Sequence, residues 1–182
     1  APKEDVLLRP IFTHIGPAAL GALACVMFFL LLVDLGRSKR TASLCTAILA
    51  LATTTFVYAR MPYSEILQLA CFVGFFRQTL RMANGPTRRE ALWWGAWAGA
   101  LFNAKYVFGL AIAGGACLIA WSLRARRREL LPLAGWAAVT GAPLLVLALV
   151  YNYLRWGDVT ATGYGPYLSA FFGGSLATAV QL

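Results

Sequence analysis

Long stretches without a charged residue alternate with short clusters of arginine along this chain. Ile15–Val33 and Thr41–Ala59 each run for 19 residues without a charge, and a helix needs ~20 apolar residues to cross the hydrocarbon of a bilayer. Lipid offers no partner to a free backbone N–H or C=O, so such segments cross membranes as helices. The sequence lacks the two-residue alternation of strands. The pattern predicts an all-α, polytopic transmembrane helical bundle.

Composition excludes the soluble function classes. Of the 182 residues, 60% are hydrophobic and only 13% are charged, whereas soluble domains carry about 25% charged residues. A soluble enzyme, a nucleic-acid-binding module and a disordered chain are therefore excluded. The net charge is +9, but the charges are too few and too regularly spaced for a nucleic-acid surface. We expect membrane lipids rather than nucleic acid as partners.

Charged and helix-breaking residues divide the chain into about six predicted spans within a single transmembrane domain, residues 1–182. The predicted spans are residues 15–35, 41–59, 64–82, 91–104, 106–123 and 130–152, and a predicted outer loop covers residues 153–166. The chain starts without methionine and stops inside an apolar stretch. We therefore expect it to be a fragment of a longer membrane protein.

The basic residues predict the orientation. If the spans alternate, 11 of the 16 lysines and arginines fall on one side, in the segments 37–40, 77–89 and 124–128. Basic loops face the cytoplasm, so the opposite ends of the helices face outward. This predicts a multi-pass protein of the inner (plasma) membrane with its active face toward the periplasm. The basic inner loops themselves are better explained by topology and lipid headgroup binding than by catalysis.

Arg60 and Glu65 flank one short turn on the predicted outer side. A guanidinium binds phosphate through paired hydrogen bonds, and the neighbouring carboxylate could orient a sugar hydroxyl or hold a divalent metal. The same residues also suit a simpler role, in which Ser64 caps a helix, Glu65 complements its dipole and Arg60 reaches the interface. The residues alone leave both interpretations open.

Lys105 and a glycine-rich loop complete the outer candidates. Ala91–Ala104 spans only ~21 Å as a helix, less than the ~30 Å hydrocarbon core, so Lys105 is expected below the outer headgroups, where a lipid phosphate or a simple snorkelling position would suit it. We expect Arg60, Glu65 and Lys105 to line one outer cavity. Asn152 and Arg155 precede a loop rich in glycine, threonine and tyrosine that could stack on a sugar or form a plain turn.

Two function classes remain on these grounds. One is an enzyme that acts on a lipid-linked phosphate at the outer face, and the other is a transporter-like or structural membrane subunit without catalytic activity. Transporters place polar groups near the bilayer midplane. The middle of each predicted span here is almost entirely apolar, which favours interfacial chemistry.

Four short motifs then carry a family resemblance. They are Tyr58–Glu65, Gly99–Tyr106, Tyr151–Gly157 and Gly163–Gly165, in that order. The chain resembles bacterial members of the dolichyl-phosphate-mannose–protein mannosyltransferase family, glycosyltransferase family 39 of the GT-C superfamily, to which the aminoarabinose transferases of lipid A are related. The resemblance runs over nearly the whole chain, with Trp156 standing where phenylalanine is expected.

The resemblance implies a GT-C-like inverting glycosyltransferase. It implies transfer of a sugar from a polyprenyl-phosphate donor to an acceptor at the outer face. The family's catalytic base is an outer-loop aspartate ahead of the segment similar to Ile15–Val33, so the base is expected upstream of residue 1 and no catalytic residue is assigned in this chain. The matching positions that bind substrate or lipid phosphate are Arg60 and Lys105 as phosphate-side cations, Glu65 as the second outer acidic residue, and Asn152, Arg155 and Tyr164 in a loop motif.

Overall fold

The computed structural model describes residues 11–61 and 64–159, and within them the chain is helical and contains no strand. The elements are η1 (Ile11–Ile15), α2 (Gly16–Asp34), α3 (Lys39–Leu51), α4 (Thr55–Tyr58), α5 (Ser64–Asn84), α6 (Arg88–Ala104), η2 (Tyr106–Phe108), α7 (Gly109–Ser122), η3 (Arg124–Arg126) and α8 (Arg127–Trp156). The prediction of an all-α protein is confirmed.

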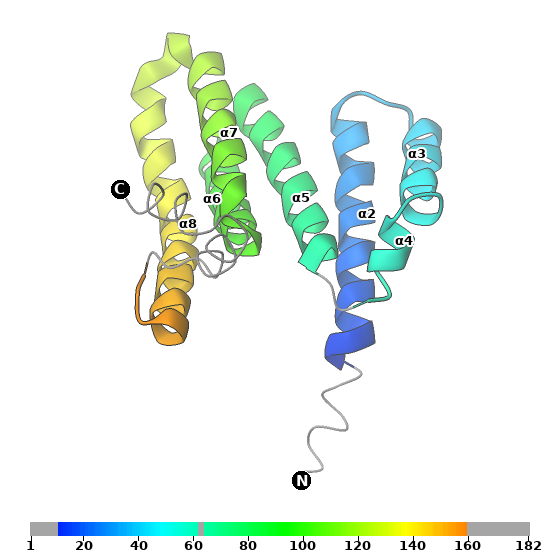
Figure 1. The fold of residues 1–182 in the computed structure, drawn as a ribbon. Helices are drawn as coiled ribbons and strands as arrows, with labels where there is room; N and C mark the ends of the chain where they lie inside the picture. Colours follow the sequence, from blue (N-terminus) through cyan, green and yellow to red (C-terminus); the bar gives the residue numbers. More distant parts are fainter. Residues whose placement is uncertain (1–10, 62–63, 160–182) are drawn as a thin grey trace, which may run out of the picture. The chain divides into compact units, whose positions relative to one another are not determined.

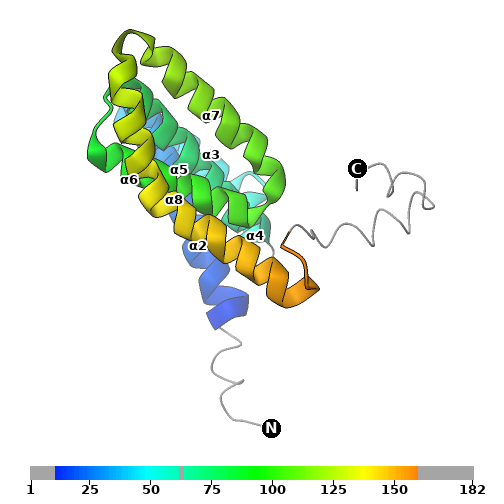
Figure 2. The same ribbon diagram turned by 90° about the vertical axis from the view of Figure 1, so that its left-hand side faces the viewer.

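Backbone contacts divide the chain into two compact units, Ala1–Ala142 and Pro143–Leu182, so that the boundary falls within α8. In the first unit the long helices run alternately in opposite directions (Figures 1 and 2). One end of this unit therefore collects residues 34–40, 77–90 and 122–128, and we call it the arginine-rich end. The other end collects residues 52–61, 64–69 and 103–109, and we call it the Glu65 end.

Helix α5 is the central helix of the first unit and packs against α2, α6 and α7. Its buried residues Ile66, Ala70 and Val73 recur at helical spacing on the covered side. Close approach to α6 depends on Gly74, because a Cβ atom there would lie 2.7 Å from the Trp97 ring. A side chain at this position would force the two helices apart.

Side-chain caps fix the helix starts at the arginine-rich end. Ser38 Oγ accepts a hydrogen bond of 3.1 Å from the backbone N–H of Thr41, at the start of α3. Thr87 Oγ1 accepts one of 3.2 Å from the backbone N–H of Glu90, at the start of α6. Both caps satisfy N–H groups that have no partner within the helix.

The predicted helix over residues 41–59 is broken in the structure. Helix α3 ends at Leu51, and α4 begins at Thr55. Thr53 is the physical cause, because its hydroxyl donates to the Leu49 carbonyl at 2.6 Å and accepts from the Thr55 N–H at 3.2 Å. A short hydroxyl side chain that bonds to its own backbone competes with helix continuation.

Helix α8 extends past its predicted end. It runs from Arg127 to Trp156, so residues 153–156 of the predicted outer loop 153–166 are helical. The helix stops at Gly157, which has a positive φ of 74° and donates its N–H to the Tyr153 carbonyl at 2.8 Å. This left-handed end is one that glycine adopts without strain. Residues 160–166 lie outside the described part of the chain.

Two helical segments of the described chain, Thr13–Asp34 and Arg124–Trp156, are long and apolar enough to cross a membrane by length and composition. Most residues in the apolar stretch of each helix are not buried inside the structure. The six predicted spans are not all matched by such helices. Helix α5 carries charges at both ends, and α6 is only 17 residues long.

Candidate functional site

A cavity of about 370 Å³ lies at the Glu65 end of the first unit. Hydroxyl groups and one carboxylate line its polar side, and three aliphatic side chains line the remainder. The lining residues are Leu49, Thr53, Thr54, Thr55, Tyr58, Glu65, Ile66 and Leu69. Hydroxyls both donate and accept hydrogen bonds, whereas an ionised carboxylate only accepts them. Most of the cavity wall is apolar, and the Glu65 carboxylate adds a hydrogen-bond acceptor to it.

The break between α3 and α4 creates this cavity. Because Thr53 interrupts the helix, the chain turns and brings three consecutive threonines to face the first turn of α5. Thr55 is buried, and its hydroxyl oxygen lies 3.0 Å from that of Thr53. Glu65 sits in the first turn of α5, where the helix dipole stabilises a negative charge.

The Glu65 carboxylate is exposed and has neither a hydrogen bond nor an ion pair to any residue in the described ranges. Its neighbour in the same turn, Ser64, has a partner, because Gln68 Nε2 donates to its hydroxyl at 3.0 Å. The carboxylate is therefore available to a ligand that enters the cavity.

Arg60 and Lys105 lie at the Glu65 end but do not line this cavity. Arg60 is exposed, and its Cζ atom stands 5.4 Å from the centroid of the Phe56 ring. Lys105 is also exposed and follows α6 with an extended backbone. Of the three residues expected to share one outer cavity, only Glu65 lines this one.

Asn152 and Arg155 belong to the second unit. Asn152 is buried and donates a hydrogen bond of 3.2 Å to the carbonyl of Val159, which ties the end of α8 to the chain that follows. Arg155 is exposed, donates to the Tyr151 hydroxyl and stands 5.0 Å from the Trp156 ring centroid. Tyr164 lies outside the described residues.

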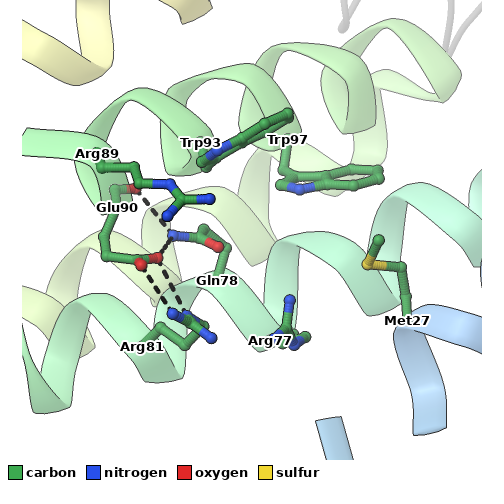
Figure 3. Close-up of a pocket in the computed structure, with 8 residues that line it drawn as sticks. All are labelled: Met27, Arg77, Gln78, Arg81, Arg89, Glu90, Trp93 and Trp97. Atoms are coloured by element: carbon green, nitrogen blue, oxygen red, sulfur yellow. Dashed lines mark hydrogen bonds and ion pairs between the residues drawn. The ribbon is translucent and has the colours of Figure 1, made fainter. Parts of the chain in front are cut away.

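A charged network at the arginine-rich end was not predicted from the sequence. Arg81 donates to both carboxylate oxygens of Glu90, at 3.2 Å from Nε and 2.9 Å from Nη2. Gln78 Nε2 donates to the same carboxylate and, at 3.0 Å, to the Glu90 carbonyl (Figure 3). The pKa of Glu90 is lowered, first by the Arg81 hydrogen bond and further by Gln78 and the nearby Arg89, against the opposing effect of burial.

Asp34 connects this network to α2. Its Oδ2 atom lies 2.8 Å from Arg77 Nε and 3.7 Å from Arg81 Nη1. The sequence contained two signals of this arrangement. Arg77 and Arg81 are four residues apart and share one helix face, and Thr87 with Glu90 forms the spacing of a capping box. The sequence alone instead explains both arginines by the orientation of the helices in the membrane.

In the part of the chain that the structure describes, no three His, Cys, Asp or Glu side chains gather as metal ligands would. Comparison with protein-family models, curated proteins and solved structures finds no match to this chain. The residues of the cavity and of the charged network therefore carry the functional argument.

Proposed function

We propose that this chain is the membrane-embedded part of an inverting glycosyltransferase that takes a sugar from a polyprenyl-phosphate donor at the outer face of the plasma membrane. In this proposal α2, α3 with α4, α5, α6, α7 and α8 are the six spans, and the Glu65 end faces the periplasm. The motif resemblance and the two long apolar helices support it. So do large apolar side chains that face outward, such as Leu110 and Leu131 at 80% and 82% exposure, because lipid solvates them as readily as a protein core does.

The observation that carries the proposal is the unpaired carboxylate of Glu65 in a cavity lined by hydroxyls. Glu65 is exposed at the edge of this cavity, and no described residue occupies its carboxylate with a hydrogen bond or an ion pair, so a ligand that enters the cavity can donate to it. A sugar matches this lining with its own hydroxyls. Glu65 accepts a hydrogen bond from a sugar hydroxyl, and Arg60 and Lys105 at the same end attract the donor phosphate.

The test compares two exposed carboxylates that occupy the first turn of a helix at opposite ends of the first unit. Glu65→Gln removes the charge in the cavity, and Glu129→Gln is the matched control, because Glu129 is exposed and only 3.7 Å from Arg126 in a surface ion pair. Membranes that contain each full-length variant are supplied with a labelled polyprenyl-phosphate sugar, and transfer of the label to endogenous acceptors is measured.

We expect Glu65→Gln to lower transfer by about 10- to 100-fold, since a hydrogen bond to a charged group contributes about 1.5–3 kcal/mol. Glu129→Gln should transfer at the wild-type rate. Equal rates for wild type and Glu65→Gln, at equal folded yield, would show that Glu65 only complements the helix dipole and would remove the main support for this function.

A further inference from the structure

Arg77 is a covered cation without a directed hydrogen bond. Its side chain is 16% exposed, and its Nε atom is buried without a hydrogen-bond partner among the described residues. The Asp34 carboxylate forms an ion pair with this atom at 2.8 Å, but the contact does not have the geometry of a hydrogen bond. The guanidinium carries further N–H donors, and the side chain is partly exposed. Arg77 can therefore donate to a further acceptor beside it.

A cavity of about 250 Å³ opens beside Arg77 in the first unit. Arg77 points into the space between Arg81 and Met27, and the Trp93 and Trp97 rings lie across from it (Figure 3). The lining thus combines guanidinium groups with aromatic and thioether side chains, together with Gln78 and the Glu90 carboxylate. This combination fits a ligand that is anionic at one part and apolar at another.

The charges around the cavity do not cancel. Arg81 is matched by Glu90, and Asp34 is shared between Arg77 and Arg81. Arg89 lines the same cavity and makes no ion pair or hydrogen bond to another described residue. With both carboxylates engaged by Arg77 and Arg81, one positive charge remains for an incoming anion.

The depth of the cavity indicates where that anion comes from. Arg77 is seven residues before the end of α5, which is about 10 Å along a helix. On the membrane arrangement proposed above, this is the boundary between headgroups and acyl chains, where tryptophan is also enriched. Basic pockets between helices at the cytoplasmic side suit anionic lipid headgroups.

We propose that the cavity formed by Arg77, Arg81, Arg89, Trp93, Trp97 and Met27 binds an anionic phospholipid of the cytoplasmic leaflet. The phosphate accepts hydrogen bonds from Arg77 and Arg89, and an acyl chain lies along Trp97 and Met27. The proposal rests on the membrane placement given above, but not on glycosyl transfer, because the cavity lies at the opposite end of the unit from Glu65.

The test uses phosphatidylglycerol with a photoreactive acyl chain, at increasing fractions in phosphatidylcholine vesicles that contain the full protein. Cross-linked peptides are mapped, and the fraction of phosphatidylglycerol at half-saturation is measured. Wild type should give saturable cross-linking to the peptides that contain Met27 and Trp93–Trp97. Arg77→Gln and Arg89→Gln should each raise the half-saturating fraction about tenfold, as loss of a hydrogen bond to a charged group predicts.

Arg40→Gln is the matched control, because Arg40 is exposed at the same end but does not line the cavity. It removes the same charge and should leave half-saturation unchanged. Arg89→Gln keeps the test decisive if Arg77→Gln fails to fold, since no other described residue pairs with Arg89. Cross-linking that is non-saturable, or equally affected by Arg40→Gln, would overturn the proposal. Displacement of the label by millimolar inorganic phosphate as effectively as by unlabelled phosphatidylglycerol would assign the cavity to free phosphate and overturn the lipid assignment.

Discussion

Two glutamates in equivalent helix positions have opposite surroundings in this protein. Glu65 and Glu90 each lie in the first turn of a helix, α5 and α6. The Glu90 side chain is 12% exposed and bonded to Arg81 and Gln78. Glu65 is exposed, at the edge of a hydroxyl-lined cavity, without such partners in the described chain. The helix dipole favours both carboxylates, so the difference arises from what the neighbouring helices bring to them.

The comparison extends to the two ends of the first unit. The arginine-rich end carries many charges, and four of them, those of Asp34, Arg77, Arg81 and Glu90, form ion pairs across α2, α5 and α6. The Glu65 end carries few charges, and these remain unpaired in the described residues. Ion pairs between helices therefore stabilise the packing at the arginine-rich end, while the charges at the Glu65 end form no such pairs among the described residues. The number of charged residues does not by itself indicate where a ligand binds.

The largest expected effect concerns which side of the membrane each end faces. With the four native cysteines replaced by alanine, Ser38→Cys at the arginine-rich end should react only with a membrane-impermeant thiol reagent supplied from the cytoplasmic side. Ser64→Cys at the Glu65 end should react only from outside. The difference should be all-or-none, because a charged reagent does not cross the bilayer. Labelling of both positions from the same side would remove the membrane arrangement and the lipid proposal with it.

The second expected effect is on the free energy of unfolding, which should fall much more in Glu90→Ala than in Glu65→Ala. Glu90→Ala leaves Arg81 without its bidentate partner. Breaking a buried ion pair is destabilising by about 3–5 kcal/mol, but Arg81 is 40% exposed, so we expect about 2–3 kcal/mol. Glu65→Ala should change stability by less than about 0.5 kcal/mol, as an unpaired surface residue does. Thermal unfolding of both variants in the same detergent measures the difference, and equal melting temperatures would contradict the comparison.

Sequence reasoning succeeded where charge patterning decides the structure. The uncharged run Ile15–Val33 predicted α2 to within a residue or two, because charged residues set the boundaries of apolar helices. It failed at residues 52–54, where the helix is broken because the Thr53 hydroxyl bonds to the Leu49 carbonyl. A hydroxyl alone does not reveal this, since threonine also occurs inside helices.

The candidate site was predicted in part for a similar reason. Glu65 was expected at an outer cavity, and the alternation of helices is enough to bring it to that end. The convergence of Arg60 and Lys105 on the same cavity depended on the direction in which each side chain leaves its helix end. Lys105 leaves α6 with an extended backbone, which no spacing rule predicts. The network of Asp34, Arg81 and Glu90 forms only where α2, α5 and α6 meet. The sequence shows the charged residues of each helix, but it does not show that they contact each other.

The smallest expected effect is the pH dependence that Glu90 contributes to stability. Its pKa in the folded protein is lowered, so the unfolded state binds a proton at a higher pH than the folded state does. The stabilisation is therefore complete above the unfolded pKa, near 4.5, and is lost as the pH falls through the folded value. One group changes stability by at most about 1.4 kcal/mol per pH unit. We expect Glu90→Gln to flatten the decline in melting temperature between about pH 5 and pH 3, and Glu65→Gln to keep it. A wild-type slope in Glu90→Gln would show that Arg81 does not depend on the ionised form of Glu90, and the distinction between the two glutamates would then rest on burial alone.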